Sequence, residues 1–110
     1  CASWPRMARW AALALTVALA GGAQAGTVPS ERAQELRHMV RQDCGSCHGL
    51  RMTGGLGRDI TPAALAGRDP ADLAAIILDG MPGTAMPGWR PLLTEDEARW
   101  IADYLMTQEP

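Results

Sequence analysis

The stretch Cys44-Gly45-Ser46-Cys47-His48 decides how this 110-residue chain is interpreted. Its pattern, C-x-x-C-H, is the signature for covalent attachment of a c-type haem. Two thiols three positions apart on a helical turn can reach the two vinyl groups of one porphyrin and form thioethers. The adjacent imidazole can then bind the iron. We therefore predict one haem c, attached through Cys44 and Cys47 and ligated by His48.

Two other uses of paired cysteines fit the chain less well. A structural zinc site needs four ligands, and no second Cys/His pair follows the first. A thioredoxin-like redox pair is expected in a βαβ setting, and no β-rich segment surrounds this motif. With Cys1 assigned to an upstream extension, both remaining cysteines serve the haem, and no disulfide is expected.

The N-terminal residues have the layout of a secretory signal peptide. Arg6 and Arg9 precede an apolar run over residues 10–20, and Ala23-Gln24-Ala25 follows as a small-x-small cleavage site. The run is too short for a permanent transmembrane helix, so a membrane attachment would require an uncleaved signal. We expect residues 1–25 to be an upstream extension and a cleaved signal peptide.

Cleavage would leave residues 26–110 as one small acidic domain. Loss of two signal-peptide arginines from ten basic residues leaves eight against twelve acidic residues, a formal charge of −4. No basic stripe indicates binding to nucleic acid. A domain of this size buries only a thin core, so the haem is expected to supply part of the apolar interior.

Hydrophobic periodicity predicts an all-α fold, and no strand pattern occurs. A helix over residues 31–43, capped by Ser30, would lead the chain into Cys44. The expected buried positions of this helix are Ala33, Leu36 and Val40.

Three further helical segments are expected. Proline near the start and glycine at the end predict a short turn over residues 61–67 and a helix over residues 69–80. Thr94 and Glu97 form a capping box for a helix over residues 95–106. The expected apolar faces are Leu73, Ile76 and Ile77 on the first long helix, and Ala98, Ile101, Ala102 and Leu105 on the second.

Two loops are expected to frame the haem. Residues 49–57 contain four glycines, which let the backbone approach a flat ligand closely. This loop is expected to wrap the proximal face. The irregular, proline-rich loop over residues 81–91 is expected to supply the second axial ligand.

Methionine opposite histidine raises the potential of a haem and suits electron transfer. Met81 and Met86 could each reach the iron from their loop. We favour Met86, which lies in the middle of the loop, whereas Met81 directly follows the helix end at Gly80. The predicted iron ligands are therefore His48 and Met86.

Two further residues are candidates for haem binding. Trp89 is expected either to pack in the core beside the methionine loop or to donate its indole N–H to a propionate. Arg51, Arg58 and Arg90 are loop cations that could neutralise propionates, and Arg58 is taken with Trp89 as a candidate haem-binding residue.

The order of helix, C-x-x-C-H, two helices, methionine loop and helix resembles class I cytochromes c over the whole of residues 26–110. Four segments are similar more specifically to the small cytochromes c of denitrification gene clusters, the c55X type, found beside cytochrome cd1 nitrite reductase. These segments are Asp43–Gly57, Gly83–Pro87, Trp89–Pro91 and Glu97–Ile101.

The resemblance implies a periplasmic, all-α monohaem protein with Cys44 and Cys47 as attachment sites and His48 and Met86 as axial ligands. It implies an electron-transfer protein rather than an enzyme, donating to cytochrome cd1 nitrite reductase. The first alternative is a redox partner in haem d1 maturation. The second alternative, a gas or nitric oxide sensor, would require displacement of Met86.

Electron exchange is expected at an exposed haem edge among apolar loop residues. This predicted docking patch comprises Leu50, Met52, Met81, Pro82 and Trp89. One departure from class I cytochromes concerns Arg58, which follows Gly57 where proline is usual. The backbone carbonyl that commonly accepts a hydrogen bond from the proximal histidine is still expected from this region.

Overall fold

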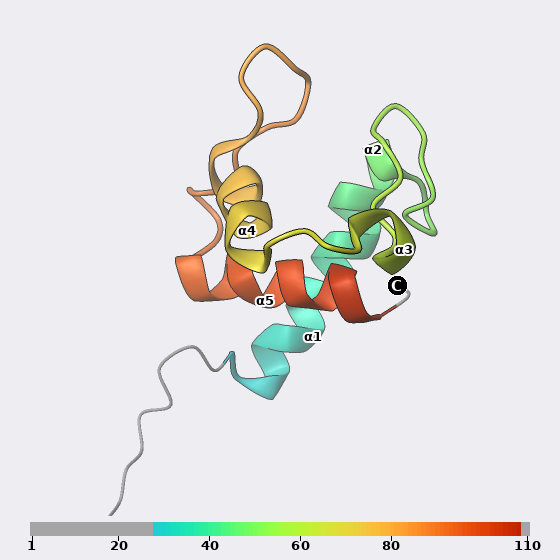
Figure 1. The fold of residues 1–110 in the computed structure, drawn as a ribbon. Coiled ribbons are helices and arrows are strands. Elements are labelled where there is room, and N and C mark those ends of the chain that lie inside the picture. The colour runs from blue at the N-terminus through green and yellow to red at the C-terminus, as the bar shows by residue number, and fades with distance from the viewer. Residues whose placement is uncertain (1–27, 109–110) are drawn as a thin grey trace, which may run out of the picture.

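The computed structural model describes residues 28–108, and in this range the chain is helical with no strand (Figure 1). The predicted signal peptide and the start of the predicted domain lie outside the described residues. Among residues 28–108, no helix has the length and apolar character needed to cross a membrane. The helical segments in chain order are α1 (Ser30–Met39), the π-helical η1 (Val40–Cys44), α2 (Gly45–His48), α3 (Pro62–Leu65), α4 (Pro70–Asp79) and α5 (Glu95–Thr107).

The helix before the haem motif is longer and less regular than predicted. The chain stays helical from Ser30 to His48, but η1 interrupts the α-helical hydrogen bonding immediately before Gly45. The predicted cap is wrong: Ser30 is the first helical residue, and Pro29 occupies the N-cap without a side-chain hydrogen bond. A proline is suited to this end because its fixed φ leads into a helix and its missing N–H is not needed there.

Helix α5 is the helix against which α1, α3 and α4 pack. In Figure 1 it runs across the middle of the molecule. The capping box is confirmed, because Glu97 N donates to Thr94 Oγ1 at 3.1 Å and Thr94 N donates to Glu97 Oε1 at 2.9 Å. All predicted apolar positions of α5 are buried, and Tyr104 is buried with them.

The other predicted apolar faces are confirmed in α1 and shifted in α4. The predicted α1 positions Ala33, Leu36 and Val40 are all buried. In α4, Ile77 is buried as predicted, but Leu73 and Ile76 are only half-buried. The residues that α4 buries are Ala74, Ile77 and Leu78.

An ion-pair network joins the beginning of α1 to the beginning of α5. The Arg32 guanidinium donates to the carboxylates of Glu97 and Glu35. The side chain of Glu97 is only 14% exposed. The hydrogen bond from Arg32 is the main reason that the pKa of Glu97 lies below its ordinary value of 4.5.

The network predicts a specific acid sensitivity. Because Glu97 has a lower pKa folded than unfolded, its contribution to stability is present above pH 4.5 and is lost as pH falls through the folded pKa. Replacement Glu97→Gln should lower the free energy of unfolding by about 1 kcal/mol at pH 7 and flatten its decline in acid. Denaturant titrations of the haem-loaded protein at several pH values measure both effects.

The matched control for this experiment is Asp96→Asn in the same helical turn. Asp96 is exposed and makes no salt bridge within the described residues. Equal pH profiles for Glu97→Gln and the unmodified protein would contradict the assigned role of Glu97.

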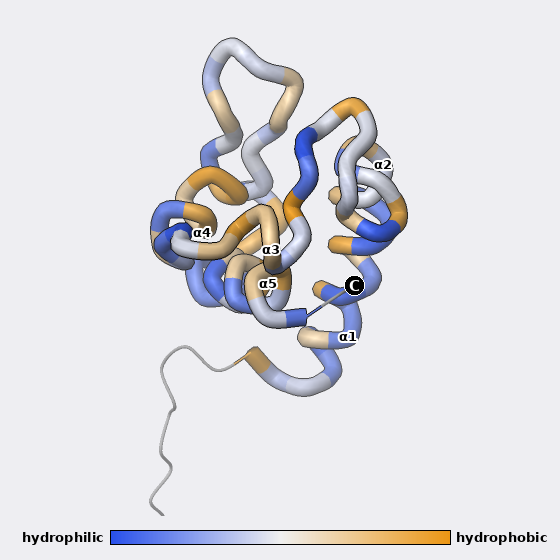
Figure 2. Tube along the Cα trace, turned by 45° about the vertical axis from the view of Figure 1, so that its right-hand side comes forward, coloured by the Kyte–Doolittle hydropathy of each residue, from blue (hydrophilic) through white to orange (hydrophobic). Residues whose placement is uncertain are grey.

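Two loops project to the same side of α5. The loop over residues 49–60 follows α2, and the loop over residues 81–91 follows α4 (Figures 1 and 2). The fold thus presents the C-x-x-C-H motif and the methionine loop at one end of the molecule.

Candidate haem site

The predicted attachment residues and His48 lie on one continuous helical segment. Cys44 ends η1, and Cys47 and His48 end α2. Both thiols are free; Cys44 is half-buried and Cys47 is exposed. Burial raises the pKa of the Cys44 thiol to about 11. A thioether has no titratable proton, so haem attachment is chemically compatible with this partly buried position.

The imidazole of His48 is oriented by the backbone of the following loop. His48 Nδ1 lies 2.7 Å from the carbonyl oxygen of Arg58. Because a carbonyl can only accept, Nδ1 carries the proton and Nε2 keeps its lone pair for a metal. The resemblance to class I cytochromes implied a carbonyl from this region, and in the structure it belongs to Arg58.

Gly57 lies directly against the ring of His48. A Cβ added at Gly57 would lie 2.7 Å from His48 Cε1 and 2.8 Å from His48 Nδ1, closer than van der Waals contact allows. The backbone is held there by a hydrogen bond from Gly57 N to the carbonyl of Cys47, at 2.7 Å. The imidazole of His48 can therefore occupy its position only because residue 57 has no side chain.

Met52 anchors the loop over residues 49–60 from within. Its side chain is fully buried, and a Cβ at Gly45 would lie 3.4 Å from Met52 Cε. Ile60 N donates to the carbonyl of Met52 at 2.9 Å. The prediction that Met52 contributes to a surface docking patch is wrong, because this side chain fills the space beneath the haem motif.

The loop over residues 81–91 presents its two methionines differently. Met86 is half-buried, whereas Met81 is exposed. Met81 N donates to the carbonyl of Met86 at 3.3 Å, so the two residues pair through their backbones. The greater burial of Met86 favours it over Met81 as the candidate ligand, and this choice stays a prediction.

The remaining candidates have different surroundings. Trp89 is half-buried and packs against the hydrophobic core, one of its two expected positions. The Arg90 guanidinium is bound to Asp79. Arg51 and Arg58 are exposed and make no salt bridge within residues 28–108, so these two loop cations are open to a propionate.

The donor set fits a covalently held iron porphyrin. It combines two free thiols one helical turn apart, an imidazole with Nε2 available and a half-buried thioether on a separate loop. Within the described part of the chain, no three or more His, Cys, Asp or Glu residues gather to hold a bare metal ion.

An all-helical domain with two thiols and a histidine in the C-x-x-C-H pattern is typical of a c-type cytochrome. Residues 31–105 match the family model described as cytochrome c oxidase, cbb3-type, subunit III. The chain is 76% identical over 95 residues to cytochrome c55X of Paracoccus denitrificans (strain Pd 1222), covering 86% of this chain and 92% of that relative. This chain belongs to the cytochrome c55X family.

Two solved structures extend the comparison. The c-type cytochrome NirC matches with a TM-score of 0.70 and 51% identity, over 72% of this chain and 93% of that chain. Dihydro-heme d1 dehydrogenase NirN, in complex with DHE, matches with a TM-score of 0.60 and 35% identity, over 67% of this chain but only 16% of that chain. A domain similar to this cytochrome is thus part of a larger protein.

These comparisons confirm the predicted all-α cytochrome c fold and a covalent haem c with iron. They also confirm that the chain is a small electron carrier rather than an enzyme.

The contact between Gly57 and His48 yields a test of the proximal side. Replacement Gly57→Ala should displace the imidazole, since the new methyl group would overlap the ring. Electron paramagnetic resonance of the ferric protein should then show a high-spin fraction that the unmodified protein lacks.

The control is Gly67→Ala, where φ is +80° and an added Cβ meets no atom within 4 Å. This variant carries backbone strain without touching a ligand. A fully low-spin Gly57→Ala protein would show that position 57 does not constrain the imidazole.

Proposed function

We propose that this cytochrome carries single electrons in the periplasm and donates them to cytochrome cd1 nitrite reductase. Cys44 and Cys47 would attach the haem, and His48 and Met86 would hold its iron. The single observation that carries the proposal is the combination of a backbone-held imidazole with a half-buried methionine on a separate loop. Two protein ligands on the iron would leave it no position for a substrate.

The haem iron, when bound, supplies a one-electron ferric–ferrous couple. This chain supplies a candidate ligand, His48, whose side-chain position is fixed before any electron is transferred. The Arg58 carbonyl and Gly57 hold the ring of His48, so the proximal side needs little rearrangement when the charge changes. A carrier that keeps its ligands in both oxidation states suits outer-sphere transfer.

Exposed apolar side chains on the two loops are the proposed contact surface. Leu50 is 76% exposed and Leu56 is 95% exposed, and Met81 is exposed on the opposite loop. Large apolar side chains open to solvent commonly mark interaction sites, and a small patch suits a partner that must dissociate. The proposed docking patch therefore keeps Leu50 and Met81 from the patch expected from the sequence and adds Leu56.

A second candidate function is electron acceptance during haem d1 maturation. It is favoured by the similarity of this chain to part of dihydro-heme d1 dehydrogenase, at 36% identity over 98 residues. A free carrier resembling a domain of that enzyme could exchange electrons with it through a similar haem edge. The same haem and the same docking patch serve either partner.

Stopped-flow mixing separates the two candidates. The reduced protein is mixed with catalytic amounts of cytochrome cd1 nitrite reductase and nitrite, and haem oxidation is followed by absorbance. Fast, saturable oxidation is expected, and Leu50→Ser with Leu56→Ser should lower the second-order rate constant by about five- to tenfold.

The matched control is Leu92→Ser, since Leu92 is 60% exposed but precedes α5. If the reductase oxidises the protein slowly, and the dehydrogenase with its substrate reduces the ferric protein rapidly, a role in haem d1 maturation is favoured instead. If Leu92→Ser and the Leu50→Ser, Leu56→Ser double variant have equal rate constants, the docking patch is rejected.

A further inference from the structure

The loop that carries Met86 leaves and rejoins α4 through a narrow neck. Trp89 N donates to the carbonyl of Ile77, and Arg90 N donates to the carbonyl of Leu78, each at 3.0 Å. The returning chain is thus hydrogen-bonded to the last turn of the helix from which the loop departs.

Two glycines make this neck possible. A Cβ added at Gly80 would lie 2.6 Å from the carbonyl oxygen of Met86, and one at Gly88 would lie 2.8 Å from that of Leu78. Backbone therefore touches backbone on both sides of the neck. Because the carbonyl of Met86 is part of this contact, the position of the ligand residue depends directly on the closure of the neck.

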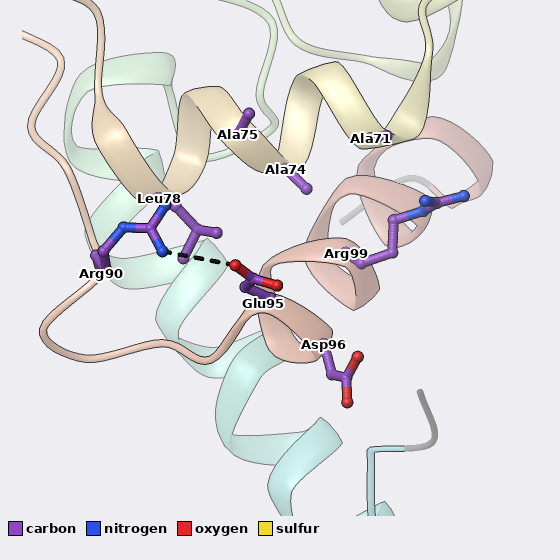
Figure 3. A pocket seen from close by; sticks show the side chains of 8 residues that line it. All are labelled: Ala71, Ala74, Ala75, Leu78, Arg90, Glu95, Asp96 and Arg99. Carbon is purple, nitrogen blue, oxygen red and sulfur yellow. Dashed lines mark ion pairs between the residues drawn. The ribbon is translucent and has the colours of Figure 1, made fainter. Parts of the chain in front are cut away.

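A bidentate ion pair closes the same neck from outside. Arg90 Nε donates to Asp79 Oδ1 at 2.8 Å, and Arg90 Nη2 donates to Asp79 Oδ2 at 3.0 Å. Arg90 also approaches Glu95, with 3.8 Å between Nη1 and Oε1 (Figure 3). Residues 80–89 contain no charged side chain, so Asp79 and Arg90 are the charges that flank the loop.

Inside the loop, the hydroxyl of Thr84 links the two methionine residues. Thr84 Oγ1 donates to the carbonyl of Met81 at 2.7 Å and accepts from Met86 N at 3.3 Å. The tip of the loop is therefore braced internally, and an opening of the whole loop would separate its two ends at the neck.

We propose that the Asp79–Arg90 ion pair is a positioning device that keeps the loop closed and thereby holds Met86 on the iron. The inference rests on Met86 as the distal ligand in the proposed function. Both side chains are about half exposed, so the pair adds little to global stability. Local opening of one loop is a separate equilibrium, and a pair across its neck acts on that equilibrium directly.

Competition by imidazole for the ferric haem-loaded protein measures loop opening. Imidazole can bind the iron only when Met86 has left, so its apparent affinity follows the open fraction. Asp79→Asn and Arg90→Gln should each tighten imidazole binding by about two- to fivefold. The exchange variant that combines Asp79→Arg with Arg90→Asp should return the affinity toward its original value.

The matched control is Arg99→Gln, which removes the similarly exposed ion pair with Asp103 on α5. It should leave imidazole affinity unchanged. Denaturant unfolding of each variant reports global stability separately, and no partner protein enters the assay.

Three results would overturn the proposal. If the imidazole affinity is unchanged in Asp79→Asn and Arg90→Gln, the ion pair does not hold the loop closed. The same conclusion follows if Arg99→Gln changes the imidazole affinity equally. Met86→Ala supplies the limiting affinity for a lost ligand. If Met86→Ala binds imidazole no more tightly than the unmodified protein, Met86 is not the ligand, and the ligation in the proposed function fails together with the ion-pair proposal.

Discussion

In the proposed ligation, one haem iron would be held by two residues that lie 38 positions apart, His48 and Met86. The packing of α5 relates the two chain segments that carry these residues. This helix packs against α1, whose helical continuation contains the haem motif, and against α4, from which the methionine loop departs. The hydrogen-bonded Arg32–Glu97 pair strengthens the first of these contacts. The distance between the two ligand segments is therefore set by helix packing, not by either loop alone.

Both ligand segments are shaped by contacts of backbone with backbone or with the ligand itself. On the proximal side, Gly57 touches the imidazole and the Arg58 carbonyl selects its tautomer. On the distal side, Gly80 and Gly88 let the two ends of the methionine loop touch. These contacts need glycine because a Cβ would occupy the space. A carrier built in this way has its ligand geometry defined by the chain, which is what rapid electron exchange requires.

Much of the fold followed from local sequence signals. The capping box of Thr94 and Glu97 and the apolar faces of α1 and α5 depend on spacings of three and four residues, and the structure confirms them. The expected cap at Ser30 failed because Pro29 can start a helix with no side-chain hydrogen bond. The π-helical turn before Gly45 could not be predicted, since it has no periodic signal.

The burial of Met52 and the Asp79–Arg90 ion pair could not be predicted, because neither follows from a periodic pattern in the sequence. Met52 lies in a glycine-rich loop, where no alternation of apolar and polar residues distinguishes a buried from an exposed side chain. The Asp79–Arg90 pair joins residues 11 apart across a loop neck, a spacing that no helix rule covers. In contrast, the Arg58 carbonyl could be located approximately, because a backbone group is present whatever the side chain.

The proposed ligation of the iron by His48 and Met86 can be tested by proton–carbon NMR of the ferrous protein labelled with ¹³C at methionine methyl groups. A methyl group of a methionine bound to the iron would experience the porphyrin ring current. One methionine methyl signal shifted far upfield is expected, which disappears in Met86→Leu and persists in Met81→Leu. The absence of a shifted methyl signal, or its disappearance in Met81→Leu instead, would show that Met86 is not a ligand.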